Sequence, residues 1–232
     1  MGQYHRATHN RTTTHLSSGW TGRGWSAKLV GSQLKEALES QMTKGRLEAF
    51  SDGVIAILIP IMVLELRIPH GTDWAALRPL VPVFLTYVLS FIFLGIYWNN
   101  HHHMLAATNR INGKILWANL HLLFWLSLVP FVTGWMGENH FAPLPTAVYG
   151  VVLLLAAISY TILQKMILNH QGPNSRLAAA VGKDVKGKLS LLCYILAIPL
   201  AFVHQWISDG LYVLVALMWL IPDRRIESKL NE

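Results

Sequence analysis

The chain alternates between long apolar runs and short polar connections, and this pattern predicts its elements. A hydrocarbon core of about 30 Å requires roughly 20 apolar residues in a spanning helix. Six runs approach that length, at residues 46–66, 77–104, 115–135, 144–168, 188–206 and 208–222. Ten-residue segments that alternate apolar and polar positions, as in a membrane barrel, are not found in the sequence. The pattern therefore predicts an all-α membrane protein with six transmembrane helices.

The segments outside these runs divide the chain into three parts. The first 25 residues are rich in Ser, Thr, Gly and His and follow no apolar period, which is typical of disorder. We expect a disordered tail at 1–43, a six-helix transmembrane domain at 44–222 and a short C-terminus at 223–232. The first 40 residues hold no apolar run of the signal-peptide type, so the first hydrophobic run is expected to be a genuine span.

The basic residues predict the orientation of these spans. All but two of the 19 Lys and Arg residues lie on the side of the predicted bundle that carries both termini, and the exceptions are Arg67 and Arg78. Because basic residues accumulate on the cytoplasmic side of membrane proteins, both termini are expected to be cytoplasmic. Topology then explains the formal net charge of +7, and no nucleic-acid partner is expected.

The overall composition agrees with a membrane protein. Hydrophobic residues make up 53% of the chain and charged residues 13%, against roughly 25% charged residues in ordinary soluble domains. The single cysteine, Cys193, lies in an apolar run. One cysteine can form neither a disulfide nor a thiolate metal cluster within one chain, and the sequence predicts no metal site and no cofactor.

The first predicted span begins with charged residues. The stretch GRLEAFSDGVIAILIPIMVLEL, residues 45–66, places Arg46, Glu48 and Asp52 before a dozen apolar positions. A carboxylate inside a membrane helix costs on the order of 3 kcal/mol unless it finds a partner or water, so Asp52 is expected to face neighbouring helices. The alternative is that Ser51 and Asp52 only cap or solvate the cytoplasmic end of the helix.

Branched aliphatic residues form a stripe along the same span. At 100° per residue, Ile57, Ile61 and Leu64 fall within about 60° of one another, and Asp52 lies about 140° from Ile57. On periodicity alone, such a stripe is more often in contact with lipid or with the core of the bundle than part of the wall of a pore.

A sequence motif decides between these interpretations. The segment RLEAFSDGVIAI carries an Arg-x-x-x-Phe-Ser-Asp pattern at Arg46, Phe50, Ser51 and Asp52. This pattern resembles the signature of the endolysosomal potassium-channel family, transmembrane protein 175, in its bacterial form with one six-helix repeat per chain. The resemblance continues through YWNNHHHM, which ends the second span, and WANLHLLFWLSLVPFVT in the third, which contains Asn119. It covers roughly residues 44–222.

The resemblance implies an architecture and a function. In that family four copies of the six-helix unit surround a pore lined by the first helix, and a hydrophobic constriction takes the place of a carbonyl filter. The positions that form the constriction correspond to Ile57, Ile61 and Leu64. The chain is therefore expected to form a homotetrameric, potassium-permeable cation channel in the bacterial plasma membrane, with potassium ions and the lipid bilayer as its partners.

The resemblance also assigns a role to the polar residues near the constriction. A buried network is expected to hold the pore helix in register, and its candidate members are Arg46, Phe50, Ser51, Asp52, Asn99, His101, His102 and His103. Fully paired polar groups in a low dielectric fix geometry strongly. Consecutive helical residues point about 100° apart, so only one or two of the three histidines can face inward.

One position departs from the family pattern. Eight residues after Asp52 the family usually carries threonine, and this chain has Pro60. Proline has no backbone N–H, so the carbonyl of Ala56 is expected to lose its helical partner and the helix to kink beside the stripe. Ala56 and Pro60 are therefore candidate pore-adjacent residues, and an unpaired carbonyl there would offer an oxygen to a dehydrating cation.

Two other classes of protein fit parts of the sequence. A proton-coupled membrane transporter would use Asp52 and the cluster from His101 to His103 as a relay, because intramembrane Asp and His are typical of proton pathways. A metal-dependent enzyme is not expected, because three adjacent histidines on one helix cannot all reach one ion. No internal repeat of the kind common in transporters is evident between the first and last three spans, which favours the channel.

Overall fold

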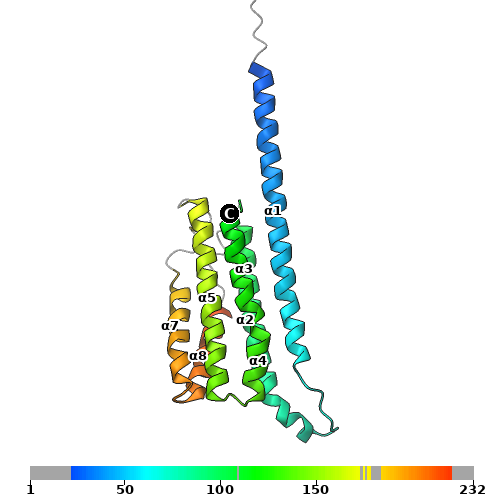
Figure 1. Cartoon of the computed structure of the whole chain (residues 1–232), viewed down its shortest axis with the longest axis vertical. Coiled ribbons are helices and arrows are strands. Elements are labelled where there is room, and N and C mark those ends of the chain that lie inside the picture. The colour runs from blue at the N-terminus through cyan, green and yellow to red at the C-terminus, as the bar shows by residue number, and fades with distance from the viewer. Residues whose placement is uncertain (1–21, 109, 173–174, 176, 179–183, 221–232) are drawn as a thin grey trace, which may run out of the picture. The chain divides into compact units, whose positions relative to one another are not determined.

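The computed structural model describes residues 22–108, 110–172, 175, 177–178 and 184–220. The chain divides into two units, residues 1–39 and 40–232, and the second contains the helical bundle. The elements described are α1 (Gly22–Leu64), the 3₁₀ helix η1 (Trp74–Leu80), α2 (Val81–Ala106), α3 (Gly113–Ser127), α4 (Val129–Glu138), α5 (Pro143–Gln171), α7 (Val185–Leu200) and α8 (Gln205–Leu220). Within these described ranges there are helices and no strands (Figure 1).

Each of the six predicted runs coincides with helical structure. Four of them are long and apolar enough to cross a membrane, namely Lys44–Leu64, Trp74–Ala106, Gly113–Glu138 and Pro143–Gln171. The last two runs form α7 and α8, with 16 residues each, which at 1.5 Å per residue extend about 24 Å. The prediction of an all-α membrane protein is confirmed, and α7 is shorter than the run at 188–206 that predicted it.

Helix α1 starts earlier than the first predicted span. It begins at Gly22, so the part of the predicted tail between residues 22 and 43 is helical, whereas residues 1–21 lie outside the described structure. The sequence QLKEALESQM at positions 33–42 consists mainly of strong helix formers, and no proline interrupts it. Intrinsic propensity therefore carries the helix back beyond the apolar run, which an argument from hydropathy alone could not reveal.

The third predicted span, 115–135, consists of two helices that meet at Leu128. Pro130 lies at the start of α4 and cannot donate a backbone hydrogen bond, which leaves the carbonyl of Leu126 without a helical partner. The N–H of Leu128 bonds to the carbonyl of Trp125 at 3.2 Å, the tighter spacing of a 3₁₀ turn. Together α3 and α4 still provide one apolar segment of spanning length.

The connection between the last two helices also differs from the prediction. Residues 201–204 form the turn between α7 and α8, whereas the predicted runs 188–206 and 208–222 placed the connection near residue 207. Ser208 and Asp209 instead lie buried inside α8. The hydroxyl of Ser208 donates to the carbonyl of Ala197 at 2.6 Å, and this contact ties the first turn of α8 to the end of α7.

The bundle packs closely where α2 meets α4. Gly137 of α4 lies against α2, and a Cβ atom added to it would stand 2.6 Å from the Cα of Val83 and 2.6 Å from the Oγ1 of Thr86. Such distances leave no room for a side chain. The glycine therefore allows the two backbones to approach each other.

Hydroxyl groups join three helices in the interior of the bundle. The Oγ of Ser90 on α2 lies 2.6 Å from the Oγ1 of Thr133 on α4 and 3.0 Å from the hydroxyl of Tyr149 on α5. All three side chains are buried. Because buried polar groups need partners, these bonds restrict how α2, α4 and α5 can shift relative to one another.

Candidate pore helix and its polar anchor

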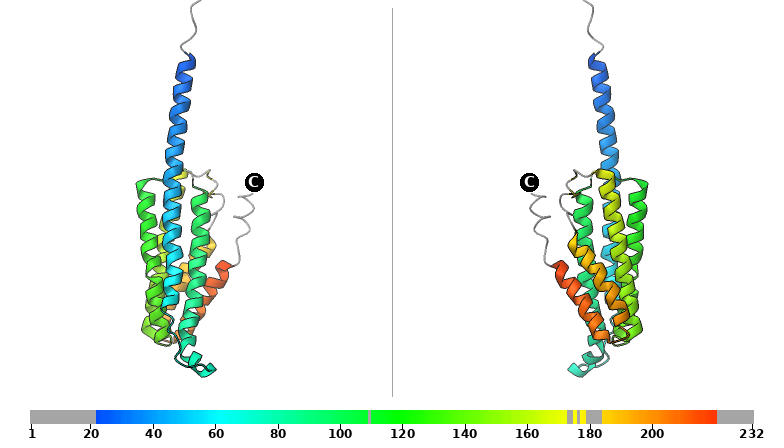
Figure 2. Two further views of the ribbon diagram at one scale, coloured as in Figure 1. Left: turned by 90° about the vertical axis from the view of Figure 1, so that its right-hand side faces the viewer. Right: turned by 90° about the vertical axis from the view of Figure 1, so that its left-hand side faces the viewer.

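From residue 40 onward, α1 presents two different faces. One face is buried against the bundle and consists of Leu47, Ser51, Ile55, Leu58 and Met62. The spacing of three or four residues keeps these side chains on one side of the helix. Figure 2 shows this part of α1 lying along α2 and the α3–α4 pair. The buried face explains how the helix is attached to the chain's own bundle.

The other face carries the predicted constriction residues. Ile57 is 59% exposed, Ile61 38% and Leu64 82% in the single chain. They lie on the side of the helix away from Ile55 and Met62, as the 100° rotation per residue requires. A stripe of large apolar side chains that the bundle leaves uncovered needs another covering surface, such as lipid or further protein.

A buried hydrogen-bond chain attaches the foot of α1 to the bundle. The Oγ of Ser51 donates to the carbonyl of Leu47 at 2.8 Å and accepts from the Nδ2 of Asn119 on α3 at 2.8 Å. The Oδ1 of Asn119 lies 2.7 Å from the Nε2 of His101 on α2. An amide oxygen can only accept, so Nε2 carries the proton. Three helices thereby meet at one chain of bonds.

The chain of bonds ends inside the protein. Ser51, His101 and Asn119 are each at most 1% exposed. The Nδ1 atom of His101 is buried and bonds to none of the residues that the structure describes. Of the three histidines whose orientation the sequence left open, His101 is the one that faces inward. Asn119 was part of the family resemblance but had not been assigned to the network, although an amide in an apolar run is a recognisable signal.

Asp52 makes a second, more exposed contact with α2. Its Oδ1 accepts a hydrogen bond from the indole Nε1 of Trp98 at 3.1 Å. The ring of His102 stacks on the same indole, with 5.9 Å between ring centroids and an interplanar angle of 23°. The carboxylate thus faces a neighbouring helix. The sequence did not identify Trp98 as the partner of Asp52, since an indole donor near a span end has no signature that would identify its acceptor.

The other candidates for the network are not brought into this chain of bonds. Arg46, Phe50, Asn99 and His103 are exposed in the single chain, and among described residues none of them bonds to Ser51 or Asp52. The ring of His103 contacts His102 at 5.6 Å between centroids.

Polar contacts also hold the part of α1 that packs on the bundle, near both ends of that part. The ammonium of Lys44 donates to the carbonyl of Ala106, the last residue of α2, at 3.0 Å. Beyond the C-terminal end of α1, Arg67 forms an ion pair with Glu138 of α4 at 2.7 Å. Both side chains of this pair are solvent-exposed, so the pair contributes about 0–1 kcal/mol and mainly restricts position.

The helix continues across the position that departs from the family pattern. Pro60 lies inside α1, and both Pro60 and Ala56 are exposed next to the stripe. Proline cannot donate to the carbonyl of Ala56. This carbonyl therefore lacks its usual donor four residues on, at a residue that borders the aliphatic stripe.

Comparison with known proteins extends these observations. The family profile described as endosomal/lysosomal potassium channel TMEM175 matches residues 46–130. A potassium channel of Chryseobacterium sp. (strain P1-3) is 56% identical over 191 residues, which cover 82% of this chain and 100% of that protein. A potassium channel of Streptomyces collinus is 32% identical over 187 residues, covering 75% and 90% of the two chains.

A solved structure has the same fold. It is titled the crystal structure of a lysosomal potassium-selective channel TMEM175 homolog from Chamaesiphon minutus, and it aligns with a TM-score of 0.67 at 28% identity. The alignment covers 78% of this chain and 97% of that chain.

The fold and the site together define an all-helical, multi-pass membrane protein. Buried hydrogen bonds hold one of its helices, α1, which presents an uncovered aliphatic stripe. The relatives are similar over nearly their full length. The chain belongs to the endosomal/lysosomal potassium channel TMEM175 family. This confirms the resemblance found in the motif around Ser51 and Asp52, and it places the chain in a family of ion channels rather than of enzymes.

Proposed function

We propose that this chain forms a potassium-permeable cation channel whose pore is lined by α1. The observation that carries the proposal is the aliphatic stripe of Ile57, Ile61 and Leu64, which the chain's own bundle leaves exposed while the opposite face of α1 is packed and hydrogen-bonded. Relatives with 56% and 32% identity are named potassium channels, which supports the choice of ion.

A single helix cannot enclose a pore, so the proposal requires several copies of the chain. Four copies arranged around an axis would bring four α1 helices together, with their stripes facing the axis. Rings of branched aliphatic side chains would then surround the path of the ion. Such rings offer no oxygen to replace the hydration shell of a cation, and a narrow ring expels water and blocks conduction until it widens.

The buried hydrogen bonds around Ser51 have a structural role in this proposal. Ser51, Asn119 and His101 bond to one another in a buried environment, where each unmade bond costs about 1–3 kcal/mol. These hydrogen bonds therefore fix how far α1 is rotated about its own axis. If α1 turned by one residue, or 100°, the stripe would no longer point toward the axis.

The proposed topology follows the basic residues. Both termini lie in the cytoplasm of a bacterial cell, the plasma membrane is the location, and residues 44–222 are the channel-forming part. The turn that carries Arg67 and Arg78 then lies on the outer side. The ion pair between Arg67 and Glu138 would brace the outer end of the pore helix, beyond Leu64.

Recording from the purified protein in a planar bilayer tests the proposal. Under a potassium to sodium gradient, we expect the reversal potential of the current to lie between zero and the potassium equilibrium potential. Native mass spectrometry in detergent should give the mass of four chains. Absence of current from protein that is folded and tetrameric would reject the channel. A monomer or dimer as the largest species would reject the shared pore.

One observation favours a second candidate function. The buried Nδ1 of His101 has no partner among described residues, and a histidine with one free nitrogen can accept a proton. A proton-coupled transporter using Asp52 and the cluster from His101 to His103 would couple flux to the proton gradient in a fixed ratio. Potassium flux into proteoliposomes that is independent of an imposed proton gradient would exclude this alternative.

A further inference from the structure

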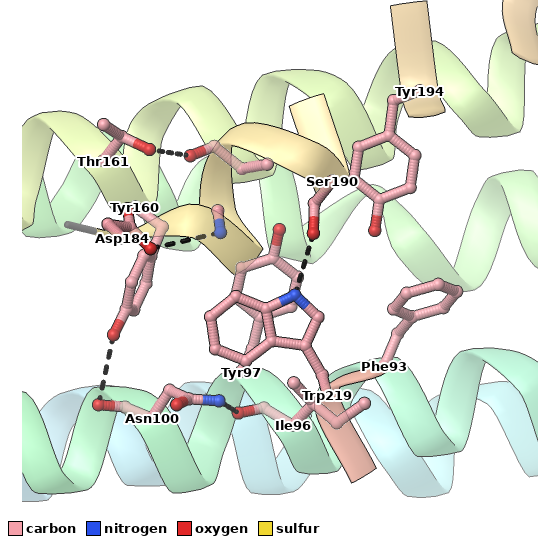
Figure 3. A pocket seen from close by; sticks show the side chains of 12 residues that line it. Phe93, Ile96, Tyr97, Asn100, Tyr160, Thr161, Asp184, Ser190, Tyr194 and Trp219 are labelled. Carbon is pink, nitrogen blue, oxygen red and sulfur yellow. Dashed lines mark hydrogen bonds between the residues drawn. The ribbon is translucent and has the colours of Figure 1, made fainter. Parts of the chain in front are cut away.

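A cavity of about 50 Å³ lies between α2, α5, α7 and α8, in a part of the bundle that α1 does not line. Figure 3 shows its walls from close by. Five aromatic rings from all four helices surround it, those of Phe93, Tyr97, Tyr160, Tyr194 and Trp219. Nothing in the proposed ion path uses this cavity.

Hydrogen bonds fix two of these rings in place. The indole Nε1 of Trp219 donates to the Oγ of Ser190 at 2.8 Å, and the hydroxyl of Tyr160 lies 3.4 Å from the carbonyl of Asn100. Tyr97 and Tyr160 also meet edge to face, with 6.2 Å between centroids. The walls of the cavity are therefore organised before any ligand enters.

Two other hydroxyl groups in the wall have no hydrogen-bond partner among the residues that the structure describes. Tyr194 is only 2% exposed, yet its hydroxyl bonds to none of the described residues, and the same holds for the hydroxyl of Tyr97. In Figure 3 the Tyr194 hydroxyl points into the space between Ser190 and Phe93. A tyrosine hydroxyl can both donate and accept a hydrogen bond, so this one is available to a group bound in the cavity.

One carboxylate lines the cavity. Asp184 precedes α7 and caps it, since its Oδ1 accepts from the N–H of Gly187 at 3.1 Å. A single accepted hydrogen bond leaves most of the carboxylate's acceptor capacity and its negative charge for a ligand. Aromatic faces are electron-rich and attract cations, most effectively those that are weakly hydrated. The aromatic rings and the carboxylate therefore both favour a positively charged ligand.

The size of the cavity limits the ligand. One water molecule requires roughly 10–15 Å³ of cavity volume. The cavity of about 50 Å³ therefore holds about three to five water-sized groups, or as many non-hydrogen atoms. A methylated ammonium group has this size. A nucleotide is too large, and the aromatic rings and Asp184 disfavour an anion.

We propose that this cavity binds a methylated ammonium group, held by the five rings and by the charge of Asp184. The group comes either from a small free solute or from the head of an amphiphile. A neighbouring side chain provides a test of the sign of the ligand's charge. The ammonium of Lys186 lies 5.9 Å from the centroid of Trp219, outside the lining residues, where its positive charge opposes a cationic ligand.

Binding to the full-length protein in non-ionic detergent tests the proposal. Isothermal titration with choline is compared with titration of 3,3-dimethylbutan-1-ol, which has the same shape without the charge. We expect choline to bind at least tenfold more tightly. Hexyltrimethylammonium provides the second arm: equal affinity to choline indicates a free solute as the source, and affinity that rises with the alkyl chain indicates an amphiphile.

Two variants test the residues. Asp184→Asn removes the charge but preserves the fold, because asparagine is an equally good helix cap and tolerates the left-handed backbone (φ 40°) at this position. It should weaken choline binding about tenfold without lowering the melting temperature. Lys186→Gln should instead strengthen binding several-fold. Trp117→Leu, an exposed change on α3, serves as the control and should leave the affinity unchanged.

Three results would overturn the proposal. The first is equal binding of choline and its neutral isostere. The second is an unchanged affinity in a folded Asp184→Asn protein. The third is weaker choline binding in Lys186→Gln, which keeps the proposal open to rejection even if the Asp184 variant fails to fold. Because the readout is binding rather than current, failure here leaves the proposed channel activity untouched.

Discussion

The side-chain amide of Asn119 donates a 2.8 Å hydrogen bond to the hydroxyl of Ser51, and this bond joins α3 to the proposed pore helix. The same amide uses its oxygen for His101. A single side chain thus satisfies polar groups on two other helices. Its removal should therefore affect the position of α1 more than the loss of any one bond would suggest.

Asn119→Ala is expected to lower the free energy of unfolding by about 2–6 kcal/mol, because two buried groups lose their partner at about 1–3 kcal/mol each. Ser51→Ala should cost less, since it leaves only one group unpaired. Denaturant titration in detergent measures both values. Ser127→Ala is the control, because that hydroxyl is exposed and its loss should change stability by less than about 0.5 kcal/mol. Equal losses for Asn119→Ala and the control would contradict the anchor.

Asp52 should be a structural residue rather than part of the ion path. Asp52→Ala removes the acceptor for Trp98 and should lower stability by about 1 kcal/mol, while the reversal potential stays the same. Asp52→Asn keeps an oxygen in that place and should cost less, and Trp98→Phe should reproduce the loss seen with alanine. A stable tetramer of Asp52→Ala with a shifted reversal potential would place the carboxylate in the permeation path instead.

Ile57→Asn should hydrate the proposed constriction. A ring of amides retains water where a ring of isoleucines expels it, so we expect a larger and less gated current with altered selectivity in bilayer recordings. Val63→Asn is a matched control, because Val63 is an exposed aliphatic residue of α1 that lies away from the stripe. If both variants, confirmed as tetramers, conduct like the unmodified protein, α1 does not line the pore.

Pro60→Thr restores the residue that the family usually carries at this position. The change supplies an N–H for the carbonyl of Ala56 and should stabilise the helix by roughly 1–3 kcal/mol. A hydroxyl beside the stripe should also shift the reversal potential toward the potassium equilibrium potential. Thermal unfolding and bi-ionic recordings measure the two effects separately. A less stable variant would show that the proline fits the backbone of α1 better than threonine does.

Gly137→Ala should separate α4 from α2. The added methyl group would meet Val83 and Thr86 at 2.6 Å, and the resulting overpacking typically costs 1–3 kcal/mol. Gly95→Ala on α2 is the opposite case, because its Cβ would have nothing within 4 Å. There the better helix propensity of alanine should stabilise by up to about 1 kcal/mol. If Gly137→Ala and Gly95→Ala shifted the melting temperature in the same direction, this account of the α2–α4 contact would be contradicted.

Periodicity predicted which side of α1 carries Ile57, Ile61 and Leu64, because a regular helix relates sequence position to direction. It could not predict where α1 begins, since the helical residues before position 44 are not apolar. The break at Leu128 was also missed, although Pro130 gives a physical reason for it. Hydropathy measures the apolar content of a segment, and two short helices in line have the same content as one long helix.

The candidate site was predictable only in part. The motif located Ser51 and Asp52, and the two residues bond to Asn119 and Trp98 on different helices. Which of three adjacent histidines faces inward depends on how α2 is rotated in the bundle, which local sequence does not determine. The aromatic cavity had no sequence signal, because its five rings come from four helices and follow no common spacing.

The attachment of α1 has a mechanical consequence. Polar bonds hold it at Lys44, at Ser51 and Asp52, and, just past its end, at Arg67. Within the described structure, no side-chain hydrogen bond links residues 53–66 to another element. The packing of Ile55, Leu58 and Met62 attaches this segment instead, and apolar packing is not directional. The part of α1 from Lys44 to Leu64 is therefore held by polar bonds near both of its ends and by packing alone in between, so that a small bend in this part would change the bore of the proposed pore while the polar bonds remain intact.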